Sequence, residues 1–421
     1  MGLKHKIATL AGRIGEHFSK GDTYDRAKLH RRLNRIYESP PIAVDPTRPA
    51  TINVLVPKVH FPSMSAGFFG VFQTAHFLRK CGYHVRLLFF DRFKFEPGEL
   101  RRAFSGYPGM EHTLDTLDYE YIGERKAPLR VSPGDTCLAT VWYSAYLAHS
   151  IMQKLGNRPF LYLIQDYEAN FYAANAWFAL AERTYHLNYH ALFSTAALEQ
   201  FFVSRDVGGL VSRQLKRIHF NNSCACSLPD RDAFFARGAN GRKRMFAFYC
   251  RPAVDRNMFE LGALTLVESV GAGIFDPEQW DFRGIGLGKC TIQLAKDLYL
   301  RQMPRMNLKD YLKSISEYDL GLTLMGSPHP SLVPFDLAGS GAVVVTNSFA
   351  NKNQLYFSGL APNVICREPH LDALMDGLAE AVARTEDLEA RYDAALQMKY
   401  PKSWDETWTP EHQSFIASVL G

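Results

Sequence analysis

Two arginines follow an apolar run in the second half of the chain. Arg251 comes directly after the run MFAFY at 245–249, and Arg256 opens a helical period that extends over 256–271. Guanidinium pairs and the free amides at a helix N-terminus both bind phosphate oxygens. We therefore expect Arg251 and Arg256 to converge on a diphosphate. The alternative is that both are surface arginines whose guanidinium groups are solvated.

Residues 319–347 have the pattern strand, loop, helix, strand. The runs LGLTL and VVVT are short and continuously apolar, which is typical of parallel strands buried on both faces. The loop GSPHPS at 326–331 then lies at the carboxyl edge of the sheet, where open α/β sheets bind ligands. A helix beginning at Ser331 or Leu332 points free amides into the same crevice. This predicts an anion site that includes His329.

Four aspartates stand out. Asp336, inside the predicted helix, could accept hydrogen bonds from ribose hydroxyls. Asp166 follows the apolar run 160–164 and is our catalytic or acceptor-side candidate, with helix capping as the alternative. Asp230 and Asp232 form a pair of metal-binding type, but they sit in a loose polar stretch, and we expect no metal site there.

The remaining elements should place these residues at two sheet edges. The first half alternates strand and helix, with strands expected at 51–57, 85–90, 137–142, 160–164 and 191–194, and a helix at 69–80. Gly67 and Gly70, in the loop after the first strand, allow the backbone to approach a ligand. In the second half we expect strands at 245–249, 280–284, 320–324 and 343–346, and near 298 and 364. The fold class is therefore α/β, with two Rossmann-like doubly wound domains that face each other across a cleft.

The expected domain limits follow from this alternation. Residues 1–50 form a basic helical arm and a proline-bearing linker, 51–215 the first domain, 216–385 the second, and 386–421 C-terminal helices that cross back to the first. The formal net charge of +5 resides in the arm, because residues 1–40 carry nine Lys or Arg against four acids. A basic amphipathic arm can lie on an anionic membrane, although packing on the body is the other interpretation.

Composition limits the function classes. The seven cysteines are odd in number and lack paired CxxC spacing, which favours reduced thiols in a cytoplasmic protein rather than a zinc or disulfide framework. No run approaches the length of a membrane span, and we expect peripheral membrane contact at most. Nothing indicates nucleic acid binding.

The segment FAFYCRPAVDRNMFELGALTLVES resembles the Arg and Lys diphosphate motif of the large retaining GT-B glycosyltransferase family. Arg251 matches the motif's arginine, and Arg256 stands where its lysine would be. Asp336, Gly339, Ser340 and Gly341 match the end of the family's paired-glutamate motif. The segment SAGFFGVFQTAHFLRKCGYHVRLL is similar to its Gly-Gly loop and following helix and strand.

Within that family, the chain is most similar to bacterial rhamnosyltransferases that build surface or S-layer glycans from dTDP-L-rhamnose. The resemblance implies metal-independent transfer with retention, without a cofactor, from that donor to a glycan acceptor on a lipid carrier. It also implies that the first domain binds the acceptor and the second the donor. Arg301 to Met303 would then line the nucleotide base.

Three positions depart from the family pattern. Pro328 replaces the first glutamate, Ala66 the first glycine, and Asp166 or a neighbour an expected histidine. Contacts to the donor sugar would then come from backbone amides of residues 329–332.

Two other functions remain open. A sugar-nucleotide epimerase has the related two-domain fold. A non-catalytic glycan-binding module would use cleft aromatics, namely Trp142, Tyr143, Phe171, Tyr172 and Trp177.

Overall fold

The computed structural model describes residues 25–59, 66–93, 96–105, 110, 113–224, 226–239, 241–304, 306 and 308–420. The chain divides into two units, residues 1–39 and 40–421. In the smaller unit, helix α2 (Arg26–Tyr37) begins after Asp25, whose carboxylate accepts a hydrogen bond from the Lys28 amide at 2.6 Å. The rest of the predicted basic arm, residues 1–24, lies outside the described residues.

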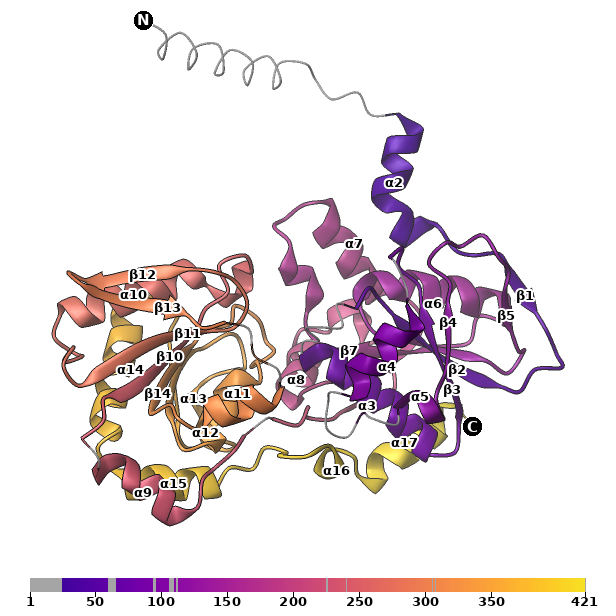
Figure 1. The fold of residues 1–421 in the computed structure, drawn as a ribbon. Coiled ribbons are helices and arrows are strands. Elements are labelled where there is room, and N and C mark those ends of the chain that lie inside the picture. Colours follow the sequence, from indigo (N-terminus) through magenta and orange to yellow (C-terminus); the bar gives the residue numbers. More distant parts are fainter. Residues whose placement is uncertain are drawn as a thin grey trace, which may run out of the picture. The chain divides into compact units, whose positions relative to one another are not determined.

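The larger unit contains two seven-stranded sheets, and each is the centre of one domain (Figure 1). In the first domain all seven strands pair in parallel. Five of them were expected from the sequence, whereas β4 and β9 were not. Their order is β4-β3-β2-β6-β7-β8-β9. The strands are β2 (Thr51–Val56), β3 (His84–Phe89), β4 (Asp118–Tyr121), β6 (Thr136–Ala139), β7 (Phe160–Ile164), β8 (Tyr189–Phe193) and β9 (Arg217–His219).

The second sheet has the order β12-β13-β11-β10-β14-β15-β16, and only the edge strand β12 is antiparallel to its neighbour. Its strands are β10 (Arg244–Tyr249), β11 (Trp280–Ile285), β12 (Thr291–Ala295), β13 (Leu298–Gln302), β14 (Leu320–Thr323), β15 (Val343–Asn347) and β16 (Val364–Arg367). The runs at 320 and 343 are fully buried, which explains why they are apolar without alternation.

Helices connect the strands of both sheets. In the first domain they are α3 (Ala66–Lys80), α4 (Pro97–Ser105), α5 (Thr113–Thr116), α6 (Trp142–Lys154), α7 (Ala176–Thr184) and α8 (Ala196–Ser204), with the 3₁₀ turns η2 (Glu168–Phe171) and η3 (Val207–Gly209). In the second they are α9 (Arg231–Ala239), η4 (Asp255–Asn257), α10 (Phe259–Gly271), α11 (Leu308–Ile315), α12 (Val333–Gly339), α13 (Gln354–Ser358), α14 (Leu371–Arg384) and α15 (Leu388–Leu396). The two domains therefore have the doubly wound architecture expected from the alternation.

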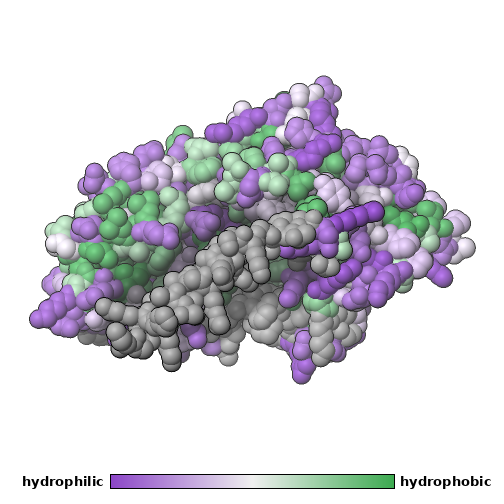
Figure 2. Space-filling view, turned by 90° about the horizontal axis from the view of Figure 1, so that it is seen from above, coloured by the Kyte–Doolittle hydropathy of each residue, from purple (hydrophilic) through white to green (hydrophobic). Residues whose placement is uncertain are grey.

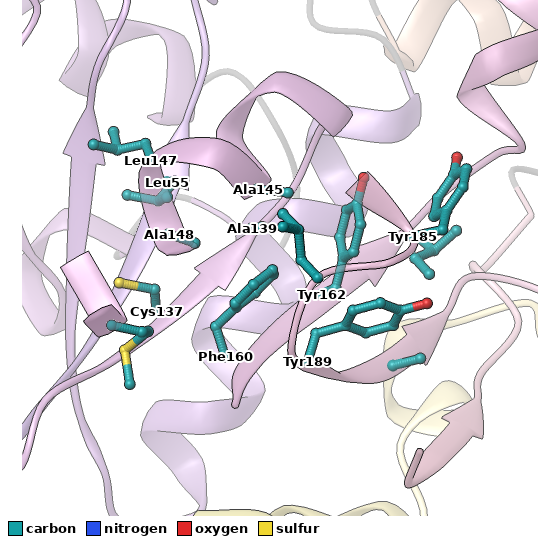
Figure 3. Close-up of a cluster of buried hydrophobic side chains, with 14 of the residues drawn as sticks. Leu55, Cys137, Ala139, Ala145, Leu147, Ala148, Phe160, Tyr162, Tyr185 and Tyr189 are labelled. Atoms are coloured by element: carbon teal, nitrogen blue, oxygen red, sulfur yellow. The ribbon is translucent and has the colours of Figure 1, made fainter. Parts of the chain in front are cut away.

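The core of the first domain holds three buried tyrosines, Tyr162, Tyr185 and Tyr189 (Figure 3). Tyr162 and Tyr185 stack with ring centroids 6.0 Å apart, and Tyr189 meets Tyr162 edge-on at 5.4 Å. The Tyr162 hydroxyl lies 3.1 Å from that of Thr184. The Tyr185 hydroxyl accepts the amide of Glu168 at 3.0 Å, which ties η2 to the core.

The C-terminal segment returns to the first domain. Helices α16 (Trp404–Thr407) and α17 (Pro410–Leu420) pack against the same hydrophobic cluster as β2 and α3. Trp408 stacks on Phe77 at 4.2 Å between centroids, and Ile416 is fully buried. The polypeptide therefore passes between the two domains twice.

Two expected limits differ from the structure. Within the predicted linker, β1 (Ile42–Val44) pairs in parallel with β5 (Leu129–Val131), so residues 40–50 belong to the larger unit. Strand β9 pairs with β8 in the first sheet, so this sheet extends beyond the expected limit at residue 215. Both strands are only three residues long, too short to produce a recognisable pattern.

The surface mixes hydrophilic and hydrophobic side chains on the face shown in Figure 2. In the second domain, Leu264, Leu287 and Tyr299 are each at least 40% exposed. Isolated apolar side chains of this kind are normal for a folded domain. Among the described residues, no helix combines the length and the apolar character needed to cross a bilayer.

Candidate functional site at the facing sheet edges

Loops from both domains meet where the strands end. Asp166 follows β7 of the first domain, and Arg256 and Ser327 follow β10 and β14 of the second. The Ser327 hydroxyl donates to Oδ1 of Asp166, and Nε of Arg256 lies 3.7 Å from Oδ2. The Asp166 side chain is only 8% exposed. A single carboxylate thus joins the two sheet edges.

Arg256 also contacts the first domain through Phe171 of η2. Its guanidinium carbon lies 4.1 Å from the centroid of the Phe171 ring, a cation–π distance. The Asp166 side chain does not accept a hydrogen bond from a backbone amide within a helix. It accepts one from the adjacent Tyr167 amide at 2.9 Å, and η2 begins two residues after Asp166. The capping interpretation of Asp166 is therefore wrong.

The expected helix start at Arg256 is also wrong. Arg256 lies in η4, and Met258, with φ of 49°, separates this turn from α10. The cause is Asn257, which is 1% exposed and whose amide donates to the Leu324 carbonyl at 3.2 Å. That bond holds the turn against the end of β14, so the helix can begin only at Phe259.

Arg251 takes a different direction from Arg256. Its Nη1 donates to the Tyr249 hydroxyl at 3.3 Å, and its stem approaches Gly286 at the end of β11. Nε of Arg251 and Nε of Arg256 are both buried without a hydrogen-bond partner among the described residues. Buried donors are nearly always paired in folded proteins, so both nitrogens are available to an acceptor that binds at this sheet edge.

The loop between β14 and α12, residues 325–331, carries His329 in addition to Ser327. It is 8% exposed, and burial lowers its pKa to about 4, so the ring is neutral at pH 7. Its Nδ1 accepts the Ser331 amide at 3.0 Å. The ring proton is therefore assigned to Nε2, which makes that nitrogen a donor.

The expectation that amides 329–332 serve the donor sugar needs correction. The His329 amide donates to the Ser327 hydroxyl at 3.2 Å, the Ser331 amide donates to His329, and Pro330 has none. Ser331 adopts φ of 66°, a left-handed conformation that closes this turn on itself. Helix α12 begins at Val333, with Leu332 as its N-cap residue.

Asp336 lies inside α12 and is 5% exposed. Its Oδ2 accepts the Tyr311 hydroxyl at 2.8 Å, so a ribose would have to share this carboxylate with Tyr311. The glycines that follow have packing roles. Gly341 has φ of 90°, and a Cβ there would lie 2.3 Å from the Phe234 ring.

The remaining predicted residues lie at the same edges. A Cβ on Gly67 would be 3.4 Å from Oε1 of Gln165, which precedes Asp166, so this glycine faces the site. The amide of Met303 donates to the Gly284 carbonyl at 2.8 Å, at the carboxyl end of β11. Arg301 is exposed near Tyr299. The loop between β2 and α3, residues 60–65, lies outside the described residues.

Glu168 is a site residue that the sequence analysis did not select. It accepts the amide of Trp142, is 9% exposed, and lies near Asp166. Burial is the main cause that raises its pKa to about 8, and the charge of Asp166 adds to the effect. The only feature of the sequence that could have indicated Glu168 is its position two residues after Asp166, near the end of β7.

This protonated carboxyl predicts a pH dependence of stability. Because its folded pKa is raised, the stabilisation from Glu168 is complete below its ordinary pKa of 4.5 and is lost as the pH rises through about 8. Glu168→Gln keeps an oxygen for the Trp142 amide. As the pH rises from 5 to 8, the free energy of unfolding should therefore increase in the variant relative to the wild type, by up to about 1.4 kcal/mol per pH unit. Urea unfolding at several pH values tests this, and parallel curves would contradict it.

Lys352 and Asn347 were also missed. Lys352 is fully buried in the loop after β15, and its Nζ donates to the Met325 carbonyl at 2.6 Å. Asn347 binds the Met325 amide and carbonyl at 2.7 and 3.1 Å. Together they fix the start of the 325–331 loop.

Asp230, the first residue of the Asp230 and Asp232 pair, has a structural role. The Asp230 carboxylate accepts the Ala233 amide at 2.8 Å, at the start of α9. Within the described ranges, no group of three or more His, Cys, Asp or Glu side chains could hold a metal ion. All seven cysteines are free thiols.

Comparisons with known proteins match both domains. Residues 51–196 match the family model described as WsaF, N-terminal domain, and residues 244–379 match WsaF, C-terminal domain. This is a GT-B chain with the WsaF pair of domains. The GT-B fold also appears in solved structures that are only 10 or 11% identical to this chain.

Two of these structures have a TM-score of 0.57. The pneumococcal O-GlcNAc transferase GtfA, in complex with UDP and GlcNAc, covers 88% of the GT-B chain and 98% of its own chain. Anabaena HepE, in complex with UDP-glucose, covers 88% and 99%. The O-antigen biosynthesis protein RfbC of Myxococcus xanthus is 29% identical over 341 residues, 77% of this chain. The GT-B chain spans 24% of the length of RfbC.

Proposed function

We propose that this protein is a glycosyltransferase that moves a sugar from a nucleoside diphosphate sugar to a growing glycan. The observation that carries the proposal is the pair of buried guanidinium nitrogens, Nε of Arg251 and Nε of Arg256, which lack a hydrogen-bond partner among the described residues at the carboxyl edge of the second sheet. A diphosphate supplies the acceptor oxygens that both lack. The WsaF matches and the likeness to RfbC support this assignment.

The chemical role of these groups follows from charge development. When the bond between the sugar and the diphosphate breaks, negative charge grows on the leaving oxygen. Arg251 and Arg256 are fixed cations placed before the reaction, so they stabilise that charge without reorganisation. Neutral His329 can donate a hydrogen bond from Nε2 to the same ligand.

The first domain has room for an acceptor beside the site. A pocket of about 530 Å³ lies along η2, and Phe349, from the loop after β15, contributes to its wall. Its lining combines aromatic rings with polar groups, as carbohydrate sites do, and includes Tyr167, Asn170, Phe178, Glu182 and Phe201. By contrast, Trp142 is 3% exposed and donates to the Tyr172 hydroxyl at 3.1 Å, so it offers no open stacking face.

We further propose L-rhamnose from dTDP-L-rhamnose as the donor, transfer with retention and without a metal, and a lipid-linked bacterial surface glycan as the acceptor. The resemblance to rhamnosyltransferases supports this choice. Thermal shift with dTDP, UDP, GDP and ADP tests the donor, because a ligand of the native state raises the melting temperature. The largest shift with dTDP supports the proposal, and no shift with any of the four would overturn it.

An epimerase is separated from a transferase by omitting the acceptor. Incubated with dTDP-L-rhamnose alone, a transferase leaves the sugar unchanged apart from slow hydrolysis. Recovery of a different nucleotide sugar would instead establish the epimerase.

A further inference from the structure

Lys352 is a buried cation with an unusual position. It is fully buried in the loop after β15, although lysine side chains are usually exposed. Its backbone forms reciprocal hydrogen bonds with Phe349, at 2.8 and 2.9 Å, and its Nζ ends on the Met325 carbonyl. The side chain is therefore held in one direction, toward the start of the loop that carries Ser327 and His329.

No carboxylate among the described side chains lies within ion-pair distance of this ammonium. A buried charge without a partner costs several kcal/mol, and lysine responds by losing its proton. Burial lowers the pKa of Lys352 to about 7, while Cys366 of β16 and Asp166 after β7 act in the opposite direction. The ring of His329 is neutral at pH 7, because burial and, to a smaller extent, the charges of Lys352 and Arg256 lower its pKa.

Beside the loop that carries Ser327 and His329, the cations Arg256 and Lys352 share the carboxylate of Asp166, which lies 3.7 Å from Arg256 and acts on Lys352 through its charge. Burial raises the pKa of Glu168 to about 8, so this second carboxyl is held protonated at pH 7 and adds no negative charge. An anion in this site completes the balance. In a poorly solvated site, Coulomb attraction acts over several ångströms, so Lys352 need not touch the anion to favour it.

We propose that Lys352 is the buried counter-cation of the donor diphosphate, and that binding of a nucleoside diphosphate draws a proton onto its amine. The proposal rests on the function proposed above. It makes Lys352 a positioning residue that acts through the 325–331 loop and through its charge.

Proton uptake is measured by calorimetry. dTDP is titrated into the full chain at pH 8 in two buffers of different ionisation enthalpy, Hepes and Tris. Wild-type protein should take up about half a proton or more for each dTDP bound, and its dTDP affinity should fall as the pH rises from 7 to 9, since binding is linked to protonation. Lys352→Met should take up none, and its Kd for dTDP at pH 7 should rise about tenfold, the scale of a lost charge contact. The exposed Lys313→Met is the matched control and should behave as wild type.

The outcomes separate the two proposals. Binding of dTDP by wild type without proton uptake overturns the role of Lys352 and leaves the glycosyltransferase proposal intact. Uptake that persists in Lys352→Met also overturns it, because another group then takes the proton. Absence of binding by wild type overturns the proposed donor and this inference with it. If Lys352→Met does not fold, the pH dependence of the wild-type affinity decides.

Discussion

Replacing either Arg251 or Arg256 with alanine should weaken dTDP binding by at least about 1.5 kcal/mol, roughly tenfold in Kd, as measured by calorimetry. Each change removes a guanidinium whose buried Nε makes no hydrogen bond to the described residues. Turnover should fall further than binding does, because charge on the leaving diphosphate grows in the transition state.

Two further variants test whether the loss of affinity is specific to Arg251 and Arg256. Arg283→Ala removes a guanidinium from the same sheet, but one that is bonded to Asp281 at 3.0 Å, and it should leave dTDP affinity unchanged. Arg256→Lys keeps the charge and restores the residue type of the family motif, and it should retain more affinity than Arg256→Ala. Unchanged affinity in both alanine variants would remove the diphosphate site from this edge.

Asp166→Ala should lower the rate of dTDP release from dTDP-L-rhamnose by about 100-fold, the effect expected when a catalytic group is misplaced by about 1 Å. Without this carboxylate, the Ser327 hydroxyl and Arg256 lose their common partner. A buried donor left unsatisfied costs about 1–3 kcal/mol, so the melting temperature should also fall by several degrees.

Asp166→Asn separates the two contacts. Its carbonyl oxygen can still accept from Ser327 and from the Tyr167 amide, but its NH₂ group faces Arg256 and cannot pair with it. We therefore expect Asp166→Asn to be more stable than Asp166→Ala but similarly slow. A variant with full turnover would show that the ion pair with Arg256 has no part in the reaction.

The sheets were predictable because buried parallel strands leave a strong signal. Strand β7 occupies the predicted residues, and β14 and β15 differ from their predicted limits by one residue each. The same signal placed Asp166, Arg251 and the 325–331 loop at sheet edges, since a strand end is visible where an apolar run stops. The alternation predicted two doubly wound domains, and the resemblance to the glycosyltransferase family supplied the GT-B fold, which the comparisons confirm.

The directions of side chains were not predictable in the same way. The break at Met258 depends on a bond from Asn257 to a carbonyl 67 residues away, which no local pattern contains. Glu168 and Lys352 owe their shifted pKa values to burial among segments distant in sequence. Local sequence shows that a residue is charged, whereas only the packed fold shows whether water reaches it.

The double crossing between the domains has a consequence for biosynthesis. Trp408 and Ile416 complete the hydrophobic cluster around β2 and α3, although about 330 residues of chain separate them from Phe77. On the ribosome, the first domain must therefore wait for residues 404–420, which are synthesised after the whole second domain. A nascent chain arrested before Trp404 emerges should expose the apolar face of α3, where a chaperone can bind.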